Sequence, residues 1–101
     1  MRIVLAPLAG QDLQEARDHI AGDSPAAADE LLVNLTNALA LLGSGLVTGA
    51  VVTLRDGRRV HYWPVPPFRI YYRIVGDELQ VIRIYHQARR PIERRPRRKR
   101  G

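Results

Sequence analysis

The fold of this 101-residue chain is decided by the sequence PPFRIYYRIVGDELQVIRIYHQARR, residues 66–90. Apolar and polar residues alternate on both sides of Gly76-Asp77, a pattern typical of two antiparallel strands joined by a tight turn. Most of the polar positions are arginine or tyrosine, whose side chains are suited to contact phosphate, carboxylate or a partner surface. The segment therefore predicts a β-hairpin with an unusual polar face.

A two-residue turn at Gly76-Asp77 would place Ile70 opposite Arg83 and Phe68 opposite Tyr85. One face is then apolar and is expected to meet the core: Phe68, Ile70, Tyr72, Ile74, Leu79, Val81 and Tyr85. Arg83 is the exception on that side and is expected at its rim, with its aliphatic stem buried. The other face mixes apolar and cationic groups, which suits a binding surface: Arg69, Tyr71, Arg73, Gln80, Ile82, Ile84 and His86.

Two helices are expected before the hairpin, because apolar residues recur at helical spacing over residues 9–20 and 28–42. Asp12, Glu15 and Asp18 are expected on the solvent face of the first helix. Ser24 followed by Pro25 is a helix-start signal, with the serine as N-cap and the proline in the first turn. A linker of about three residues makes the two helices an antiparallel pair.

The remaining elements are short strands. Residues 2–5 are apolar and predict a first strand, while Asp56-Gly57 predicts a tight turn between strands at 51–55 and 58–63. The order is one strand, two helices and four strands. This order predicts an α+β fold in which a helical hairpin packs on one face of a mainly antiparallel sheet of about four strands.

The positive charge of the chain is concentrated at its C-terminus. Residues 1–88 contain eight Arg and nine Asp or Glu, a net charge of −1, whereas residues 89–101 sum to +7. We expect a domain at residues 1–93 followed by a flexible basic tail at 94–101. The tail either remains solvated or makes weak nucleic-acid contacts.

The chain has no cysteine and no apolar run of the roughly 20 residues that a membrane span needs. A cytoplasmic protein without membrane partners is expected.

Several motifs in this order resemble the RelE/ParE superfamily of toxins from bacterial toxin–antitoxin modules. They are LAP at residues 5–7, SPAA at 24–27, FRIYYRI at 68–74 and IRIYHQARR at 82–90. The last motif is most similar to the ParE branch, whose final strand runs into a His-x-x-Arg ending. The resemblance implies a small toxin that a cognate antitoxin neutralises, through an acidic segment in our interpretation. Its target would be DNA gyrase for a ParE-like member, or mRNA on the ribosome for a RelE-like endoribonuclease.

The residues leave both mechanisms open, with ParE-like inhibition favoured. Metal-free RNA cleavage needs cations for the phosphate and an acid and a base, and the candidates are Arg69, His86 and Arg89. The aromatic or His side chain that several nuclease members place near the chain end is missing. Each candidate also has a purely structural interpretation. Arg69 and Arg73 could belong to a solvated face of the sheet, and His86 could be a strand-end histidine bonded to backbone. The candidate partner-binding residues are Arg69, Tyr71, Arg73, Ile82, Ile84, His86, Arg89 and Arg90. No cofactor or metal site is expected, since a Gly-rich phosphate loop and zinc-ligand spacing are both missing.

Overall fold

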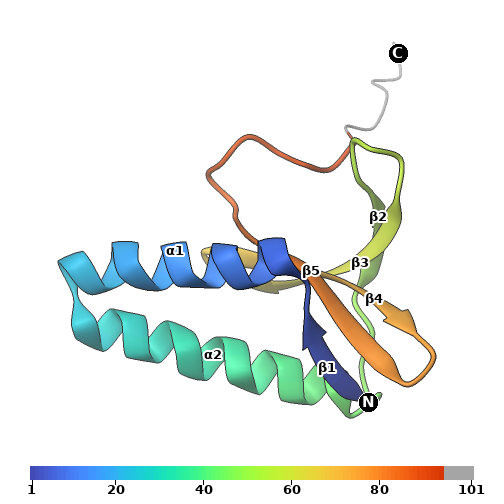
Figure 1. Cartoon of the computed structure of the whole chain (residues 1–101), viewed down its shortest axis with the longest axis horizontal. Coiled ribbons are helices and arrows are strands. Elements are labelled where there is room, and N and C mark those ends of the chain that lie inside the picture. The colour runs from blue at the N-terminus through green and yellow to red at the C-terminus, as the bar shows by residue number, and fades with distance from the viewer. Residues whose placement is uncertain (95–101) are drawn as a thin grey trace, which may run out of the picture.

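A layer of two helices covers one face of a five-stranded sheet in the computed structural model, which describes residues 1–94 (Figure 1). The elements are β1 (Arg2–Leu5), α1 (Pro7–Asp23), α2 (Pro25–Gly43), β2 (Ala50–Thr53), β3 (Arg59–Val65), β4 (Phe68–Val75) and β5 (Glu78–His86). The strand order is β1-β5-β4-β3-β2, with β1 parallel to β5 and the other pairs antiparallel. The predicted α+β architecture is confirmed, with β1 as a fifth strand at one edge.

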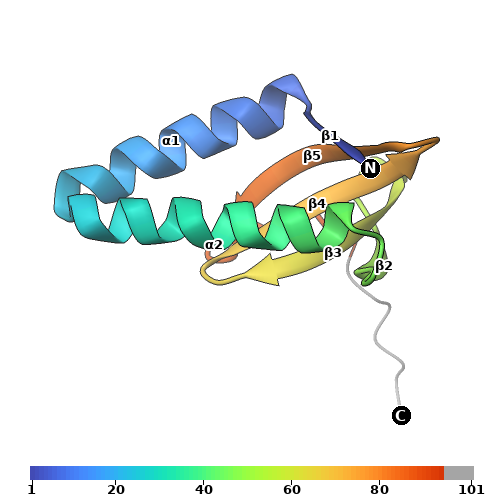
Figure 2. The same ribbon diagram turned by 90° about the horizontal axis from the view of Figure 1, so that it is seen from below.

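One residue, Ser24, separates the two helices, so the linker is shorter than predicted. Its backbone N–H donates to the Ile20 carbonyl at 2.7 Å, which closes the end of α1. Its hydroxyl accepts a hydrogen bond from the Ala27 N–H at 3.2 Å, and Pro25 occupies the first turn of α2. Ser24 therefore ends one helix and caps the next, which forces the chain to reverse (Figure 2).

The main core lies between the helices and the sheet. It is formed by buried apolar side chains from both layers, including Leu31, Leu35, Leu42, Ile70, Tyr72, Leu79 and Val81. Tyr72 is 1% exposed, and its hydroxyl accepts a hydrogen bond from the buried Gly49 N–H at 2.6 Å. The His61 ring stacks on Tyr72 with 5.2 Å between ring centroids. These contacts fix the chain between α2 and β2 against the centre of the sheet.

The register of the β4–β5 hairpin agrees with the prediction only near the turn. Pairing runs as expected from Val75–Glu78 to Tyr72–Val81, but a bulge then places Tyr71 opposite Arg83. Beyond the bulge Ile70 faces Ile84, Arg69 faces Tyr85 and Phe68 faces His86. The predicted Ile70–Arg83 and Phe68–Tyr85 pairs are therefore wrong.

The physical reason is one extra residue in β5, Ile82. An inserted residue exchanges the faces of the side chains that follow it. Ile84 consequently lies in the helix-side core at 2% exposure, and Tyr85 packs on the opposite face.

The second face of the sheet is covered by the residues that follow β5. Residues 87–94, here named the C-terminal strap, cross this face on the side opposite the helices (Figure 1). Ile92 of the strap packs against a cluster of four buried side chains: Leu54, Val60, Tyr71 and Ile82. Ile82 lies on the second face as predicted and is covered by this contact, whereas the predicted place of Ile84 on the same face is wrong, because Ile84 lies in the main core.

The strap is attached to β2 and the β2–β3 turn by backbone hydrogen bonds. The Arg55 N–H donates to the Ile92 carbonyl at 2.8 Å, and the Arg94 N–H donates to the Thr53 carbonyl at 2.7 Å. Of the basic tail predicted at 94–101, Arg94 is paired in this way, and residues 95–101 lie outside the described residues. Within residues 1–94, no helix has the length and apolar character needed to span a membrane.

Candidate functional site

Three polar side chains meet where the strap crosses β4. Glu93 accepts a hydrogen bond from Arg69 Nη1 at 2.8 Å and another from the Tyr71 hydroxyl at 2.7 Å. The Arg69 guanidinium also lies over the Tyr62 ring, 4.8 Å from its centroid, a cation–π geometry. Arg69, Tyr71 and Glu93 therefore form a closed network on the second face.

The network shifts the protonation of its members. Burial raises the pKa of the Tyr71 hydroxyl, and its hydrogen bond to the Glu93 carboxylate raises it further. Burial works to lower the pKa of the Arg69 guanidinium, but Glu93 and Tyr71 outweigh that effect and the pKa is raised. Tyr71 is consequently held as a neutral donor and Arg69 as a cation whose charge is already paired.

A surface cleft of about 170 Å³ lies beside this network. It is lined by Arg69, Tyr71, Tyr85, His86, Gln87, Arg89, Pro91 and Glu93, so the structure brings the three nuclease candidates to one cleft. His86 Nδ1 accepts a hydrogen bond from the Ala88 N–H at 3.0 Å, and its ring meets the Phe68 ring edge-on at 5.0 Å. His86 is thus the backbone-bonded strand-end histidine considered from the sequence.

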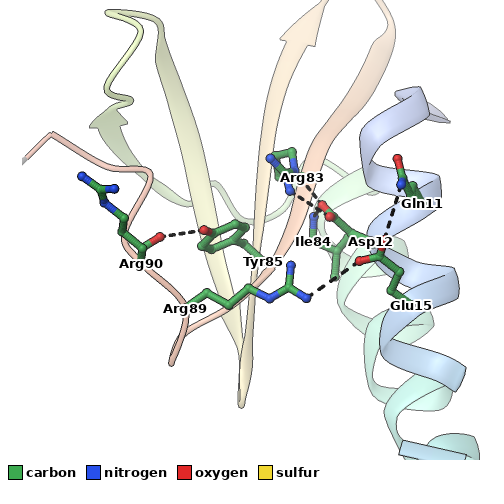
Figure 3. Close-up of polar contacts among 8 residues, drawn as sticks. All are labelled: Gln11, Asp12, Glu15, Arg83, Ile84, Tyr85, Arg89 and Arg90. Carbon is green, nitrogen blue, oxygen red and sulfur yellow. Dashed lines mark hydrogen bonds and ion pairs between the residues drawn. The ribbon is translucent and has the colours of Figure 1, made fainter. Parts of the chain in front are cut away.

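A carboxylate that sequence reasoning placed in solvent joins α1 to β5. Asp12 is 8% exposed, and it accepts bonds from Arg83 Nε at 2.7 Å, Arg83 Nη2 at 2.9 Å and the Ile84 N–H at 3.0 Å (Figure 3). The hydrogen bond to Asp12 raises the pKa of Arg83 against the opposing effect of burial. Asp12 sits three residues after Ala9 and four before Ala16, on the apolar side of the helix. This spacing from Ala9 and Ala16 is the sequence signal that Asp12 lies on the buried side of α1 and therefore needs a polar partner.

A weaker contact joins the strap to α1. Arg89 Nη2 lies 3.8 Å from Glu15 Oε2, and the two side chains are 57% and 50% exposed. The Tyr85 hydroxyl donates to the Arg90 carbonyl at 2.6 Å, which fixes the start of the strap (Figure 3).

The predicted partner-binding residues divide by exposure. Arg73, Arg89 and Arg90 are exposed, and Arg69 and His86 are partly exposed. Tyr71, Ile82 and Ile84 are buried, at 2%, 7% and 2% exposure. In the part of the chain that the structure describes, no group of three or more His, Cys, Asp or Glu side chains is placed to hold a metal ion.

The family model described as "ParE toxin of type II toxin-antitoxin system, parDE" matches residues 3–91. This chain belongs to the ParE toxin family. The resemblance found in the sequence is thereby confirmed at the level of the ParE branch.

A solved structure has the same fold as this ParE-family toxin. It is titled "Chromosomal ParDE TA system from P. aeruginosa", has a TM-score of 0.66 and is 21% identical. The match covers 85% of this chain and 95% of that one. A comparison with curated proteins gives no match.

Proposed function

We propose that this ParE-family toxin acts by binding and inhibiting DNA gyrase, without cleaving RNA, and that a cognate antitoxin neutralises it. The proposal rests on the Glu93 carboxylate, which lies 2.8 Å from Arg69 Nη1. A phosphate that approached Arg69 would meet this negative charge, and like charges at such a distance are unfavourable. The Tyr71 hydroxyl donates a hydrogen bond to the same carboxylate, and the pKa of Tyr71 is raised. Tyr71 is therefore a poor base for RNA cleavage.

The exposed edge strand β1 supports a protein partner. Ile3, Val4 and Leu5 are between 37% and 41% exposed, and β1 is the outermost strand on its side of the sheet. A short apolar edge strand can accept a further strand from another chain. In this arrangement one antitoxin segment pairs with β1, which the sequence did not single out. An acidic stretch of the antitoxin then lies near Arg73 or Arg89, which are exposed members of the predicted partner-binding set.

The test is a supercoiling assay with purified toxin, gyrase and relaxed plasmid. We expect loss of supercoiling, restored by an equimolar amount of antitoxin. Relaxation of the same plasmid by topoisomerase I is the control, because a toxin that merely coats DNA would inhibit both enzymes. Undiminished supercoiling at tenfold excess of folded toxin would contradict the proposal.

A ribosome-dependent endoribonuclease is the second candidate, because Arg69, His86 and Arg89 line one cleft. Primer extension on mRNA from a translating extract distinguishes the two functions. Cuts that appear with the wild-type toxin and disappear with Arg69→Ala would favour the nuclease. Intact mRNA at toxin levels that stop gyrase would exclude it.

A further inference from the structure

A surface groove of about 200 Å³ lies between the start of α1 and the β2–β3 turn, beside the C-terminal strap. Its lining combines three apolar side chains with three arginines: Leu8, Leu54, Ile92, Arg55, Arg58 and Arg83. Leu8 is 54% exposed, so one apolar wall of the groove is in contact with water. The groove shares no lining residue with the cleft beside Arg69 and is therefore a separate surface.

The charges around the groove are only partly neutralised within the protein. Arg83 is paired with Asp12 at 2.7 Å (Figure 3), and Arg58 is paired with Asp56 at 2.8 Å. Arg55 is exposed, and no Asp or Glu of residues 1–94 forms an ion pair with it. An apolar wall beside an unneutralised cation is complementary to an apolar side chain that lies next to a carboxylate.

The groove also continues the exposed edge of β1. Leu5, the last residue of β1, lies opposite Val81, and Arg83 follows two positions later on β5. Leu5 is 41% exposed, and Leu8 comes three residues after it. The apolar surface of β1 therefore runs into the groove, and a strand that pairs with β1 reaches the groove where it leaves the sheet.

We propose that this groove docks the antitoxin segment that follows the strand paired with β1, and that it selects a carboxylate flanked by bulky apolar side chains. The inference rests on the proposed function, since it takes the antitoxin as the partner. The apolar side chain packs on Leu8, and the carboxylate next to it pairs with Arg55. A nucleic acid fits the groove less well, because its phosphates gain nothing from the apolar wall and are repelled by Asp56.

The first test measures the affinity of the full-length toxin for its purified cognate antitoxin by isothermal titration calorimetry. Leu8→Ser removes the apolar wall and is expected to weaken binding about tenfold or more. Val33→Ser on α2 is the matched control, because Val33 is 57% exposed and lies outside the groove. The control is expected to bind as tightly as the wild type.

The second test reverses the charge of Arg55. Arg55→Glu is expected to weaken binding about tenfold at low ionic strength and much less at about 1 M KCl, where the Debye length falls to about 3 Å. The effect of Leu8→Ser should persist at high salt. Arg17→Glu makes the same change of charge at an exposed position of α1 and should leave the affinity unchanged. Arginine then replaces each Asp and Glu of the antitoxin in turn, and one of these variants should restore binding to the Arg55→Glu toxin.

Circular dichroism and the unfolding midpoint establish that the variants fold, and Leu8→Gln replaces Leu8→Ser if the latter does not. Wild-type affinity in both groove variants, or equal losses in Leu8→Ser and Val33→Ser, would overturn the proposal. A dimer of the toxin alone that Leu8→Ser dissociates would assign the groove to a second copy. Loss of gyrase inhibition with unchanged antitoxin affinity would assign it to gyrase. Either result would also overturn the proposal.

The outcomes separate this inference from the proposed function. An antitoxin that does not bind the wild-type toxin would overturn both the groove assignment and neutralisation by the antitoxin. A toxin that binds the antitoxin through Leu8 and Arg55 but leaves gyrase active would overturn the proposed target and support the groove assignment.

Discussion

Replacing Asp12 with asparagine tests whether the Asp12–Arg83 pair holds α1 on the sheet. Asp12 is 8% exposed and the Arg83 side chain is 23% exposed, with the two groups 2.7 Å apart. The asparagine oxygen can still accept from the Ile84 N–H, but its NH₂ group would face the guanidinium. Breaking a buried pair costs about 3–5 kcal/mol, and because Arg83 can reach water we expect a loss of about 2–3 kcal/mol.

Replacing Asp12 with alanine separates a second contribution. This variant also leaves the buried Ile84 N–H without its acceptor, which lies at 3.0 Å in the native protein. An unsatisfied buried donor costs about 1–3 kcal/mol. Asp12→Ala is therefore expected to be less stable than Asp12→Asn by about 1 kcal/mol or more.

The assay is urea unfolding followed by fluorescence of Trp63, the single tryptophan, which packs against the main core. A double-mutant cycle with Arg83→Met isolates the pair, and we expect a coupling free energy of about 1.5 kcal/mol or more. Glu15→Gln is the control, because its exposed partner lies 3.8 Å away and such pairs are worth about 0.5 kcal/mol or less. A loss below about 1 kcal/mol for Asp12→Asn, or a coupling near zero, would refute the reasoning.

Three further predictions follow from single contacts. Tyr72→Phe removes the acceptor of the buried Gly49 N–H and should lower the free energy of unfolding by about 1–3 kcal/mol, measured by urea denaturation. Ser24→Ala removes the N-cap of α2 and should cost about 1 kcal/mol, with Ser24→Asp as the variant that keeps the cap. The pKa of Tyr71 is raised above its unfolded value near 10, so its stabilising effect is complete below about pH 10 and is lost as pH rises further. Unfolding midpoints between pH 8 and 11 should fall more steeply for the wild type than for Tyr71→Phe, and equal profiles would contradict the shift.

The helices and the turns were predictable because their signals are local. Ser24-Pro25 sets a helix start through one side-chain oxygen and one fixed backbone angle, and both features are present in the structure. Asp56-Gly57 and Gly76-Asp77 set their turns because glycine adopts positive φ, which is 91° at Gly57 and 61° at Gly76.

The candidate site was predictable only in part. Arg69, His86 and Arg89, which the sequence indicated as one candidate set, do line one cleft, with Arg69 in β4, His86 at the end of β5 and Arg89 in the strap. The extra residue Ile82 could not be read from alternation, since a bulge is set by how the two strands pack against their neighbours. Its effect was to exchange Ile84 and Tyr85 between the two faces.

The order of elements, the apolar helix faces and the concentration of charge after residue 88 all follow from the amino-acid sequence. These features depend on residues close together in the chain. Two pairings are visible only in the folded protein: Asp12 pairs with Arg83, 71 positions away, and Glu93 neutralises Arg69, 24 positions away. Such pairings depend on which distant surfaces meet, and a buried charge selects its partner only after packing has removed water from both.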